Sequence, residues 1–448
     1  MNSRFLEICV LLISLLKWMI LAGLVGMIVG LSSTVFLLVL QKGIEALEVI
    51  SSPVLFLPIG LALSAWLTTR IAPETQGHGT ERVIQAIHQR AGLIHERVVP
   101  VKLIATIVTI ATGRSAGNIG PCAQIGSGLC SLAAHRLRFN ELDRQRIVIC
   151  GISAGFAAVM GTPVAGALFA VEVLYIGRLG YGVLYPSFVS AFIGYQVSLA
   201  LGVHHVSVML PNTPAFSVSL FWHVALAGVV FGLSAWLFVE LLKVTGEVSS
   251  WLGPRKVLTG LIGGSTLIGV ALLFSTQTLG LGWTTITQVL EGGSVVGYVF
   301  LLKALATCIT LQLGGSGGII LPLLFIGATL GSAFADWLHM DPSMFAALGF
   351  VSLFAGATNT PIAAIVLALE LFGPGLSMYA ALTCSMSYLL TGHRSAIPTQ
   401  ILQETKSPSV HLESVEEIEQ ATWTISPREH TITHTLLRLW RKYAKPPE

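Results

Sequence analysis

Charged side chains are scarce in this chain of 448 residues. Asp, Glu, Lys and Arg make up only 10% of it, apolar residues make up 53%, and the mean hydropathy is +0.78. A soluble domain usually carries about 25% charged residues, so this chain has too few to cover a surface that faces water. The composition predicts a polytopic membrane protein, and it excludes most soluble enzymes and all fibrous or disordered proteins.

Features of metal, redox and nucleic-acid proteins are also lacking. No Cys-x-x-Cys pair occurs, and the six cysteines lie mostly in apolar stretches, where we interpret them as small buried apolar residues. The net charge of +3 gives no reason to expect nucleic acid. No Ser/His/Asp constellation is supported by motif context. We therefore expect neither an enzyme, nor a cofactor, nor a bound metal.

The apolar segments predict broken membrane spans. The first, 9–40, is too long for a signal peptide, and we expect a helix followed directly by a span. The apolar length allows roughly ten or more crossings, but several segments are short or interrupted by Gly and Pro, which is tolerated only where protein covers the freed backbone. We expect a transmembrane domain over 1–400 and a polar cytoplasmic tail over 401–448 without a regulatory domain pair. The basic residues of 136–146 and of the tail indicate the cytoplasmic side.

An internal repeat is the strongest signal. The segments 102–131 and 303–332 align without gaps at an offset of 201, with thirteen of thirty positions identical. The shared positions include Lys102/Lys303, Thr106/Thr307, Ser115/Ser316, Gly117/Gly318 and Pro121/Pro322. A second block follows in each half, with Pro163 answering Pro361 and Glu172 answering Glu370. We predict an all-α fold of two inverted-topology repeats, with halves of roughly 15–200 and 217–400, as in many transporters and channels.

The repeated turns have the composition of an anion site. In each half a Gly/Ser cluster ends a span, and a proline starts the next apolar segment: GRSAGNIGP over 113–121 and GGSGGIILP over 314–322. The first N–H groups of a helix lack internal partners and carry partial positive charge. Two such helix starts that meet inside the membrane would bind an anion without the need for a fully charged side chain. Such a site also lets the anion leave, which a pore requires.

The chain resembles the CLC family of chloride channels and proton-coupled anion exchangers over roughly residues 15–405. The motif G-S/H-G-x-P-E resembles GHGTER over 77–82, with His78 at the central position. The motif G-R-E-G-P resembles Gly117–Pro121, with Asn118 for Arg and Ile119 for the gating Glu. The motif G-x-F-x-P resembles Gly318–Pro322, with Ile320 for Phe. S-I-Y-T resembles AIPT over 396–399, with Pro398 for the central Tyr.

The resemblance implies where a small anion would bind. Backbone N–H groups of Ile319 and Ile320 would hold it centrally, and outer contacts would come from Asn118, Ile119, Gly120, Ile320 and Leu321. His78 and Gly79 would also contact the anion, with His78 in place of a hydroxyl donor. For His78 two interpretations stay open: a pH-dependent donor, or a histidine whose ring is satisfied by a carbonyl at a helix start.

The departures from the motifs favour passive conduction. Ile119 has no titratable group at the gating position, and the register from Pro163 places the inner proton carboxylate at Val173, which is apolar too. Its neighbour Glu172 is either a shifted relay or, because Glu370 occupies the matching place, part of a shared structural pair, which we favour. The two repeated lysines we interpret as snorkelling to an interface.

The sequence therefore predicts a chloride channel, or an uncoupled pathway for chloride or similar small anions. The alternatives are an exchanger that uses His78, Glu81 or Glu172, and a non-conducting membrane scaffold. A fluoride-type member is a further alternative, although the departures do not match the pattern expected of that branch. By family resemblance we expect a homodimer with one pore per subunit, in a lipid bilayer. The short form suggests the plasma (inner) membrane of a prokaryote.

Overall fold

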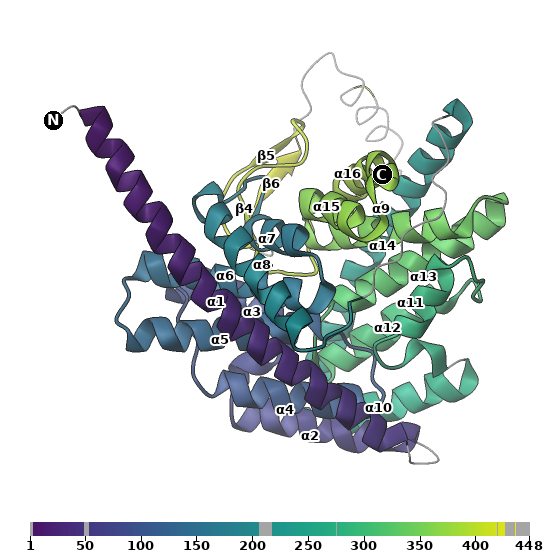
Figure 1. Cartoon of the computed structure of the whole chain (residues 1–448). Coiled ribbons are helices and arrows are strands. Elements are labelled where there is room, and N and C mark those ends of the chain that lie inside the picture. The colour runs from purple at the N-terminus through teal and green to yellow at the C-terminus, as the bar shows by residue number, and fades with distance from the viewer. Residues whose placement is uncertain are drawn as a thin grey trace, which may run out of the picture.

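The computed structural model describes residues 3–48, 53–205, 217–274, 276–418, 420–425 and 435. These residues form a helical fold with a few very short strands (Figure 1). The α-helices of the first half are α1 Ser3–Glu48, α2 Leu57–Arg70, α3 Gly79–Arg90, α4 Val98–Ala111, α5 Ile119–Arg136, α6 Glu141–Met160, α7 Pro163–Glu172 and α8 Leu184–Ala200. Those of the second half are α9 Val218–Trp251, α10 Lys256–Leu273, α11 Trp283–Leu290, α12 Val299–Gln312, α13 Ile320–Leu338, α14 Pro342–Thr358, α15 Pro361–Phe372 and α16 Pro374–Thr391.

The short strands pair segments that are distant in sequence. The parallel pairs are β1 Gly77–His78 with β3 Ser316–Gly317, and β2 Tyr175–Ile176 with β4 Ile401–Leu402. The antiparallel pair is β5 Val410–Leu412 with β6 Trp423–Ile425. Short 3-10 turns lie at η1 Pro53–Phe56, η2 Pro73–Thr75, η3 Tyr181–Val183 and η4 Thr276–Thr278. The pairing of β2 with β4 attaches the start of the tail to the end of α7.

Among the described residues, five helical segments are long and apolar enough to span a membrane on their own. They are Arg4–Leu47, Tyr181–Ala200, Val218–Trp251, Lys256–Leu273 and Ile320–Leu338. Six further apolar helices of the described residues are 10–17 residues long, shorter than the ~20 residues that a span needs. Short helices of this kind are stable at membrane depth because other helices surround them, as the complete burial of most of α14 illustrates.

The helix α1 is much longer than a bilayer is thick. Its 46 residues span about 69 Å at 1.5 Å per residue, and its N-terminal part projects beyond the other helices (Figure 1). Further along, Gly26 and Gly30 pack directly on α8, where a Cβ would lie 2.6 Å from the Ser190 carbonyl oxygen and 2.8 Å from that of Gly194. The predicted N-terminal helix and span are therefore one continuous helix.

Glycine sets the closest helix contacts of the core. A Cβ on Gly327 of α13 would lie 2.0 Å from the Gly349 carbonyl oxygen of α14, and one on Gly331 would lie 2.0 Å from the Phe345 oxygen. Without a side chain the two backbones approach directly, as small residues allow in membrane helices. Five of the six cysteines are buried in this packing and Cys9 is partly buried, and all six are free thiols, as the sequence predicts.

The matched carboxylates of the repeat join the two halves reciprocally. The Glu172 carboxylate, at the end of α7, accepts the N–H groups of Ile362 and Ala363 at 3.0 and 2.8 Å, in the first turn of α15. The Glu370 carboxylate accepts those of Val164 and Ala165 at 2.9 and 2.7 Å, in the first turn of α7. Each carboxylate thus satisfies donors that a helix start leaves unpaired. The shared structural role favoured from the sequence is confirmed.

The interpretation of the repeated lysines as snorkelling residues is wrong. Lys102 and Lys303 are both fully buried. The Lys102 ammonium donates to the carbonyl oxygens of Thr75 and Gly77 at 3.1 and 2.9 Å, and Lys303 donates to those of Thr278 and Gly280 at the same two distances. The loops that precede α3 and α11 turn these carbonyls inward, and the hydrogen bonds to them partly compensate the cost of burying each charge.

The tail folds back onto the helices as far as the structure describes it. The Lys406 ammonium donates to Asn359 Oδ1 at 2.5 Å and to the Tyr388 carbonyl oxygen at 2.7 Å, and it lies 4.0 Å from the centre of the Tyr388 ring. The Glu417 carboxylate accepts a hydrogen bond from Gln89 at 2.6 Å. The basic end of the tail that the sequence assigns to the cytoplasm lies outside the described residues.

Candidate functional site

The two repeated turns meet at the centre of the molecule. The Gly117 N–H donates to the Gly318 carbonyl at 2.8 Å, and the Gly318 N–H donates to Gly117 at 2.7 Å, as an isolated antiparallel bridge. A Cβ on Gly318 would lie 2.9 Å from the Gly120 nitrogen, so only glycine permits this approach. Because the turns pair directly, the helices α5 and α13 begin beside each other, as the repeat predicts.

Four buried hydroxyls reinforce this pairing with the symmetry of the repeat. Ser115 Oγ lies 2.8 Å from Thr307 Oγ1, and Thr106 Oγ1 lies 3.2 Å from Ser316 Oγ. Each pair joins a residue of one turn to the span of the other half. The sequence shows these residues as matched positions, but their pairing across the halves depends on the folded structure. The effect is to fix the two helix starts relative to each other.

A third helix start joins them. Strand β1 pairs with β3 so that Gly77 faces Ser316 and His78 faces Gly317. The next residue, Gly79, begins α3, and a Cβ there would lie 2.5 Å from the Gly120 carbonyl oxygen. The starts of α3, α5 and α13 therefore converge, and their free N–H groups place partial positive charge at one point.

The residues expected to bind the anion surround this point and are buried. Asn118, Ile119, Ile319, Ile320 and Leu321 are each at most 5% exposed. No side-chain cap closes the start of α5 or of α13, and Asn118 Oδ1 is buried without a hydrogen bond. The arrangement thus leaves helix donors uncovered by the side chains. That they bind an anion stays a prediction.

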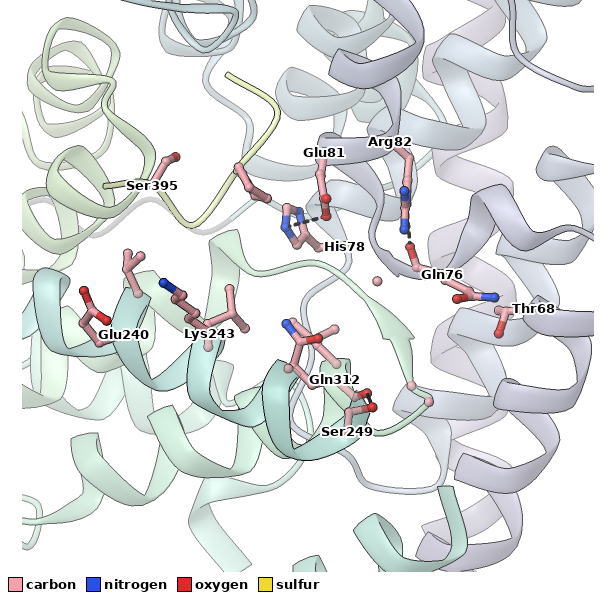
Figure 2. A pocket seen from close by; sticks show the side chains of 18 of the residues that line it. Thr68, Gln76, His78, Glu81, Arg82, Glu240, Lys243, Ser249, Gln312 and Ser395 are labelled. Atoms are coloured by element: carbon pink, nitrogen blue, oxygen red, sulfur yellow. Dashed lines mark hydrogen bonds and ion pairs between the residues drawn. The ribbon is translucent and has the colours of Figure 1, made fainter. Parts of the chain in front are cut away.

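A cavity of about 750 Å³ leads to His78 from one side (Figure 2). Its walls come from α2, α3, α9 and the segment that follows α16, and Pro398 and the glycines 314 and 315 line it. Ile119, Ile319, Ile320 and Leu321 are not among its lining residues. The wall carries more basic than acidic side chains. The basic ones are Arg82, Lys243, Lys256 and Arg394, and the carboxylates are Glu81 and Glu240. Excess positive charge of this kind raises the local concentration of anions.

His78 and Glu81 form a close pair at the cavity wall. His78 Nε2 lies 3.0 Å from Glu81 Oε2, and the imidazole side chain is 5% exposed. The carboxylate of Glu81, one helical turn onward, lies on the same face, and the Ala396 backbone is a second partner of the ring. The interpretation of His78 as a ring satisfied by a carbonyl therefore stays open beside the pairing with Glu81.

Two further positions inferred from the family motifs are Pro398, at the place of the central Tyr, and Val173, at the place of the inner carboxylate. Pro398 lines the cavity together with His78. The Val173 side chain is fully buried, and its carbonyl accepts the Gln400 amide at 2.8 Å. That amide also donates to Thr358 at 2.9 Å, and Thr399 donates to the Glu81 carbonyl at 3.2 Å. Sequence reasoning missed Gln400, which fixes the segment that carries Pro398 and has no counterpart in the repeat that would point to it.

Sequence reasoning also missed Arg114, which lies in the first repeated turn. Its side chain is fully buried, and all three guanidinium nitrogens lack a hydrogen-bond partner among the described residues. A Cβ on Gly60 of α2 would lie 2.9 Å from one of these nitrogens. The second half has Gly315 at the matching position, so the repeat gives no sign of the arginine. A buried charge without a partner destabilises a fold.

We expect Arg114→Met to raise the thermal unfolding midpoint. Methionine fills similar space without the charge, and replacing buried ion pairs by packed apolar groups of similar volume is often neutral or stabilising by about 1–4 kcal/mol; a buried charge without a partner should gain at least as much. Differential scanning fluorimetry of the purified protein measures the effect, with Arg97→Met as the control, because Arg97 is exposed at the start of α4. A lower midpoint than the wild type would show that the charge is compensated in the native protein.

Comparison with known proteins agrees with this geometry. The family model described as "Voltage gated chloride channel" matches residues 60–392. A "Chloride/fluoride channel protein" of Pseudomonas syringae pv. tomato is 37% identical over 398 residues, which cover 87% of each chain. The "H(+)/Cl(-) exchange transporter ClcA" of Citrobacter koseri is 28% identical over 71% of this chain and 72% of its own.

Solved structures show the same fold. A "CLC-type fluoride/proton antiporter" superposes with a TM-score of 0.82 at 28% identity, over 87% of this chain and 98% of its own. A "slow cyanobacterial Cl-/H+ antiporter" superposes with a TM-score of 0.76 at 22% identity, over 84% and 94%. The repeat, the paired turns and the match over most of the membrane portion lead to one conclusion. This chain is a membrane protein of the voltage-gated chloride channel (CLC) family, whose members are channels or transporters rather than enzymes.

Proposed function

We propose that this chain conducts small anions passively, as a channel or an uncoupled pathway, through the point where α3, α5 and α13 begin. The observation that carries this proposal is the Gly117–Gly318 bridge, which sets two helix starts side by side with no carboxylate between them. Backbone N–H groups attract an anion without holding it as a full charge would. Conduction needs this balance, because an ion must leave as readily as it binds.

The absence of titratable side chains at two positions supports uncoupled transport. Ile119, at the start of α5, cannot enter the anion path as a carboxylate and leave it on protonation. Val173 is apolar and buried. Its neighbour Glu172 is held by two backbone N–H groups of α15, which oppose the movement that a proton relay needs. These three side chains therefore do not favour a proton relay.

Proton-coupled exchange is the second candidate. Relatives named as an H(+)/Cl(-) exchange transporter and a fluoride/proton antiporter favour it, and so does the His78–Glu81 pair beside the proposed anion path. The relative named as a chloride/fluoride channel protein favours the first candidate. These names also bring fluoride into consideration beside chloride, although the motif departures seen in the sequence do not match a fluoride-type branch.

We further propose a homodimer, with one pore in each subunit, in the inner membrane of a prokaryote. The family resemblance supports the assembly, and the bacterial relatives support the location. Exposed apolar side chains on α8, α15 and α16 would be covered by lipid or by the second subunit. They include Phe192, Leu199, Ile362, Leu369, Met378 and Leu389.

We expect liposomes that contain the purified protein to lose chloride without moving protons uphill. The liposomes are loaded with chloride, valinomycin releases the counter-voltage, and chloride efflux and proton uptake are recorded together. Parallel liposomes loaded with fluoride compare the two anions, and protein-free liposomes measure leakage. Backbone donors with no titratable gate predict fast efflux with no stoichiometric proton signal.

Two results would contradict the proposal in different ways. Proton uptake in a fixed ratio to chloride would establish the exchanger, and the relay would then be sought among His78, Glu81 and Glu172. No flux of either anion would favour the non-conducting scaffold. The paired glycine turns argue against a scaffold, because a scaffold does not require two uncapped helix starts at one point.

A further inference from the structure

A chain of hydrogen bonds connects the tail to the wall of the cavity. The Lys406 ammonium donates to Asn359 Oδ1 at 2.5 Å. The Asn359 amide in turn donates to Gln400 Oε1 at 3.1 Å and to the Arg394 carbonyl at 2.9 Å. Gln400 Oε1 also accepts the Ser395 hydroxyl at 2.5 Å, and Ser395 lines the cavity (Figure 2). A cation of the tail is thus linked to the cavity wall through two side-chain amides.

The cation fixes the direction of both amides. An ammonium group only donates hydrogen bonds, so Asn359 turns its oxygen to Lys406 and its NH2 group to Gln400. Gln400 then turns its oxygen to Asn359, and its NH2 group donates to the carbonyls of Val173 and Thr358 at 2.8 and 2.9 Å. All four amide N–H groups are used. Because successive hydrogen bonds polarise one another, removing the cation weakens the whole chain.

The internal repeat indicates that Asn359 is needed for its amide. Gly161 occupies the matching position in the first half, and each residue ends a helix in the left-handed conformation, with φ of 74° and 57°. Glycine adopts this conformation freely, whereas a side chain there costs some strain even for asparagine. The backbone of this junction therefore does not require asparagine. What Asn359 adds is the amide that joins Lys406 to Gln400.

The segment that these amides hold forms one side of the cavity. Pro398 lines the cavity together with Glu81, whose backbone carbonyl accepts the Thr399 hydroxyl at 3.2 Å. Ile418 of the tail is a second wall residue, and its N–H donates to the Gln400 carbonyl at 2.9 Å. Proline has no N–H of its own with which to fix the backbone. The width of the cavity at this wall therefore depends on the side chains that hold the segment.

We propose that the tail sets the size of the anions that pass this wall, because Lys406 positions the Pro398 segment against α3 through Asn359 and Gln400. The inference rests on the proposed anion path. Lys406, Asn359 and Gln400 are positioning residues, since all three lie behind the cavity wall rather than in it. A segment that is held in one place discriminates against an anion larger than chloride, such as iodide, and a loosened segment discriminates less.

The decisive variant is Asn359→Asp. The carboxylate has the size of the amide, tolerates the left-handed backbone and keeps an acceptor for Lys406, but it has no N–H to donate to Gln400. We expect the ratio of iodide flux to chloride flux to rise about fivefold, the factor that one hydrogen bond of ordinary net strength contributes to an equilibrium. Lys406→Met removes the cation itself and should raise the ratio in the same direction.

Efflux from liposomes that contain the full-length protein and equal concentrations of chloride or iodide, with valinomycin present, measures the two fluxes. Their ratio does not depend on the amount of folded protein, so a purely structural role leaves it unchanged. Lys42→Met is the control for Lys406→Met, because Lys42 is exposed on α1. Glu370→Ala is the control for lost stability, because it removes a helix cap outside this network. Both controls should keep the wild-type ratio.

The outcomes separate this inference from the proposed function. A wild-type ratio in Asn359→Asp would overturn the inference and leave the anion path intact, and it decides even if Lys406→Met does not fold. An equal rise of the ratio in Glu370→Ala would also overturn the inference, because general loosening of the helices would then explain the effect. No flux of either anion through the wild type would contradict the anion path itself.

Discussion

Ile119→Glu is expected to block chloride flux at neutral pH and to release it in acid. The new side chain would sit in the first turn of α5, where no side chain caps the free N–H groups. The interaction of a carboxylate with a partly buried helix start is favourable by up to about 2 kcal/mol. This free energy corresponds to a roughly thirtyfold excess of conformers in which the carboxylate occupies the helix start over conformers in which it does not. The carboxylate would thus compete with the anion, and we expect flux at pH 7.5 to fall roughly thirtyfold.

Protonation reverses the competition, because a neutral carboxyl loses its attraction to the helix start. Flux of the variant should therefore recover as the pH falls below the range in which carboxylates titrate. Ile119→Gln is the control, since it has the same size without the charge and should conduct at every pH. Efflux from liposomes over a series of pH values measures both variants. Wild-type flux in Ile119→Glu at neutral pH would show that this position lies outside the anion path.

Glu172→Ala is expected to destabilise the protein strongly without altering proton coupling. The substitution leaves the N–H groups of Ile362 and Ala363 without their carboxylate. Each buried donor left unsatisfied costs about 1–3 kcal/mol, so the two together cost about 2–6 kcal/mol. Glu370→Ala removes the equivalent cap of α7. Its effect should be smaller, because Glu172 is buried whereas Glu370 is only partly buried, and the bond from Val164 to Glu370 lies at the surface.

The thermal unfolding midpoint of each purified variant tests this order. Glu291→Ala is the control, because Glu291 is exposed at the end of α11, and it should leave the midpoint unchanged. Glu172→Gln keeps an acceptor oxygen and should fall between the wild type and Glu172→Ala. A Glu172→Gln protein that is as stable as the wild type but has lost a measurable proton flux would identify Glu172 as a relay and contradict the structural role.

The sequence predicted those features that its own repetition makes visible. The offset of 201 pairs Gly117 with Gly318, and the structure places these two glycines in contact. The match of Glu172 with Glu370 indicated a shared structural role, and reciprocal caps confirm it. In both cases a residue type is needed for a local physical reason: glycine for a close backbone approach, and a carboxylate for a helix start. Local reasons of this kind can be read from residues and spacing.

Where burial decides a residue's role, the sequence was a weaker guide. The two repeated lysines, near the starts of their spans, were expected at an interface, since an isolated ammonium does not stay in an apolar interior. The loops that supply their carbonyl partners lie 23 to 27 residues upstream, and nothing local predicts that those carbonyls turn inward. Arg114 is the opposite case, because no pattern shows that its side chain is enclosed.

The sequence by itself determined that this protein is an all-α membrane protein of two repeated halves. Its apolar composition requires a lipid environment, and its internal repeat indicates two halves of similar structure. The sequence also located the two glycine turns that precede α5 and α13, and it showed that Ile119 and Val173 have no titratable side chain. Only the tertiary structure decided which polar groups satisfy one another. The pairing of His78 with Glu81, the hydroxyl pairs across the halves and the exchange of caps between α7 and α15 all join groups by distance and direction. In a medium without water such groups are stabilised by partners within the protein, and the packing of the whole chain decides which partner each one has.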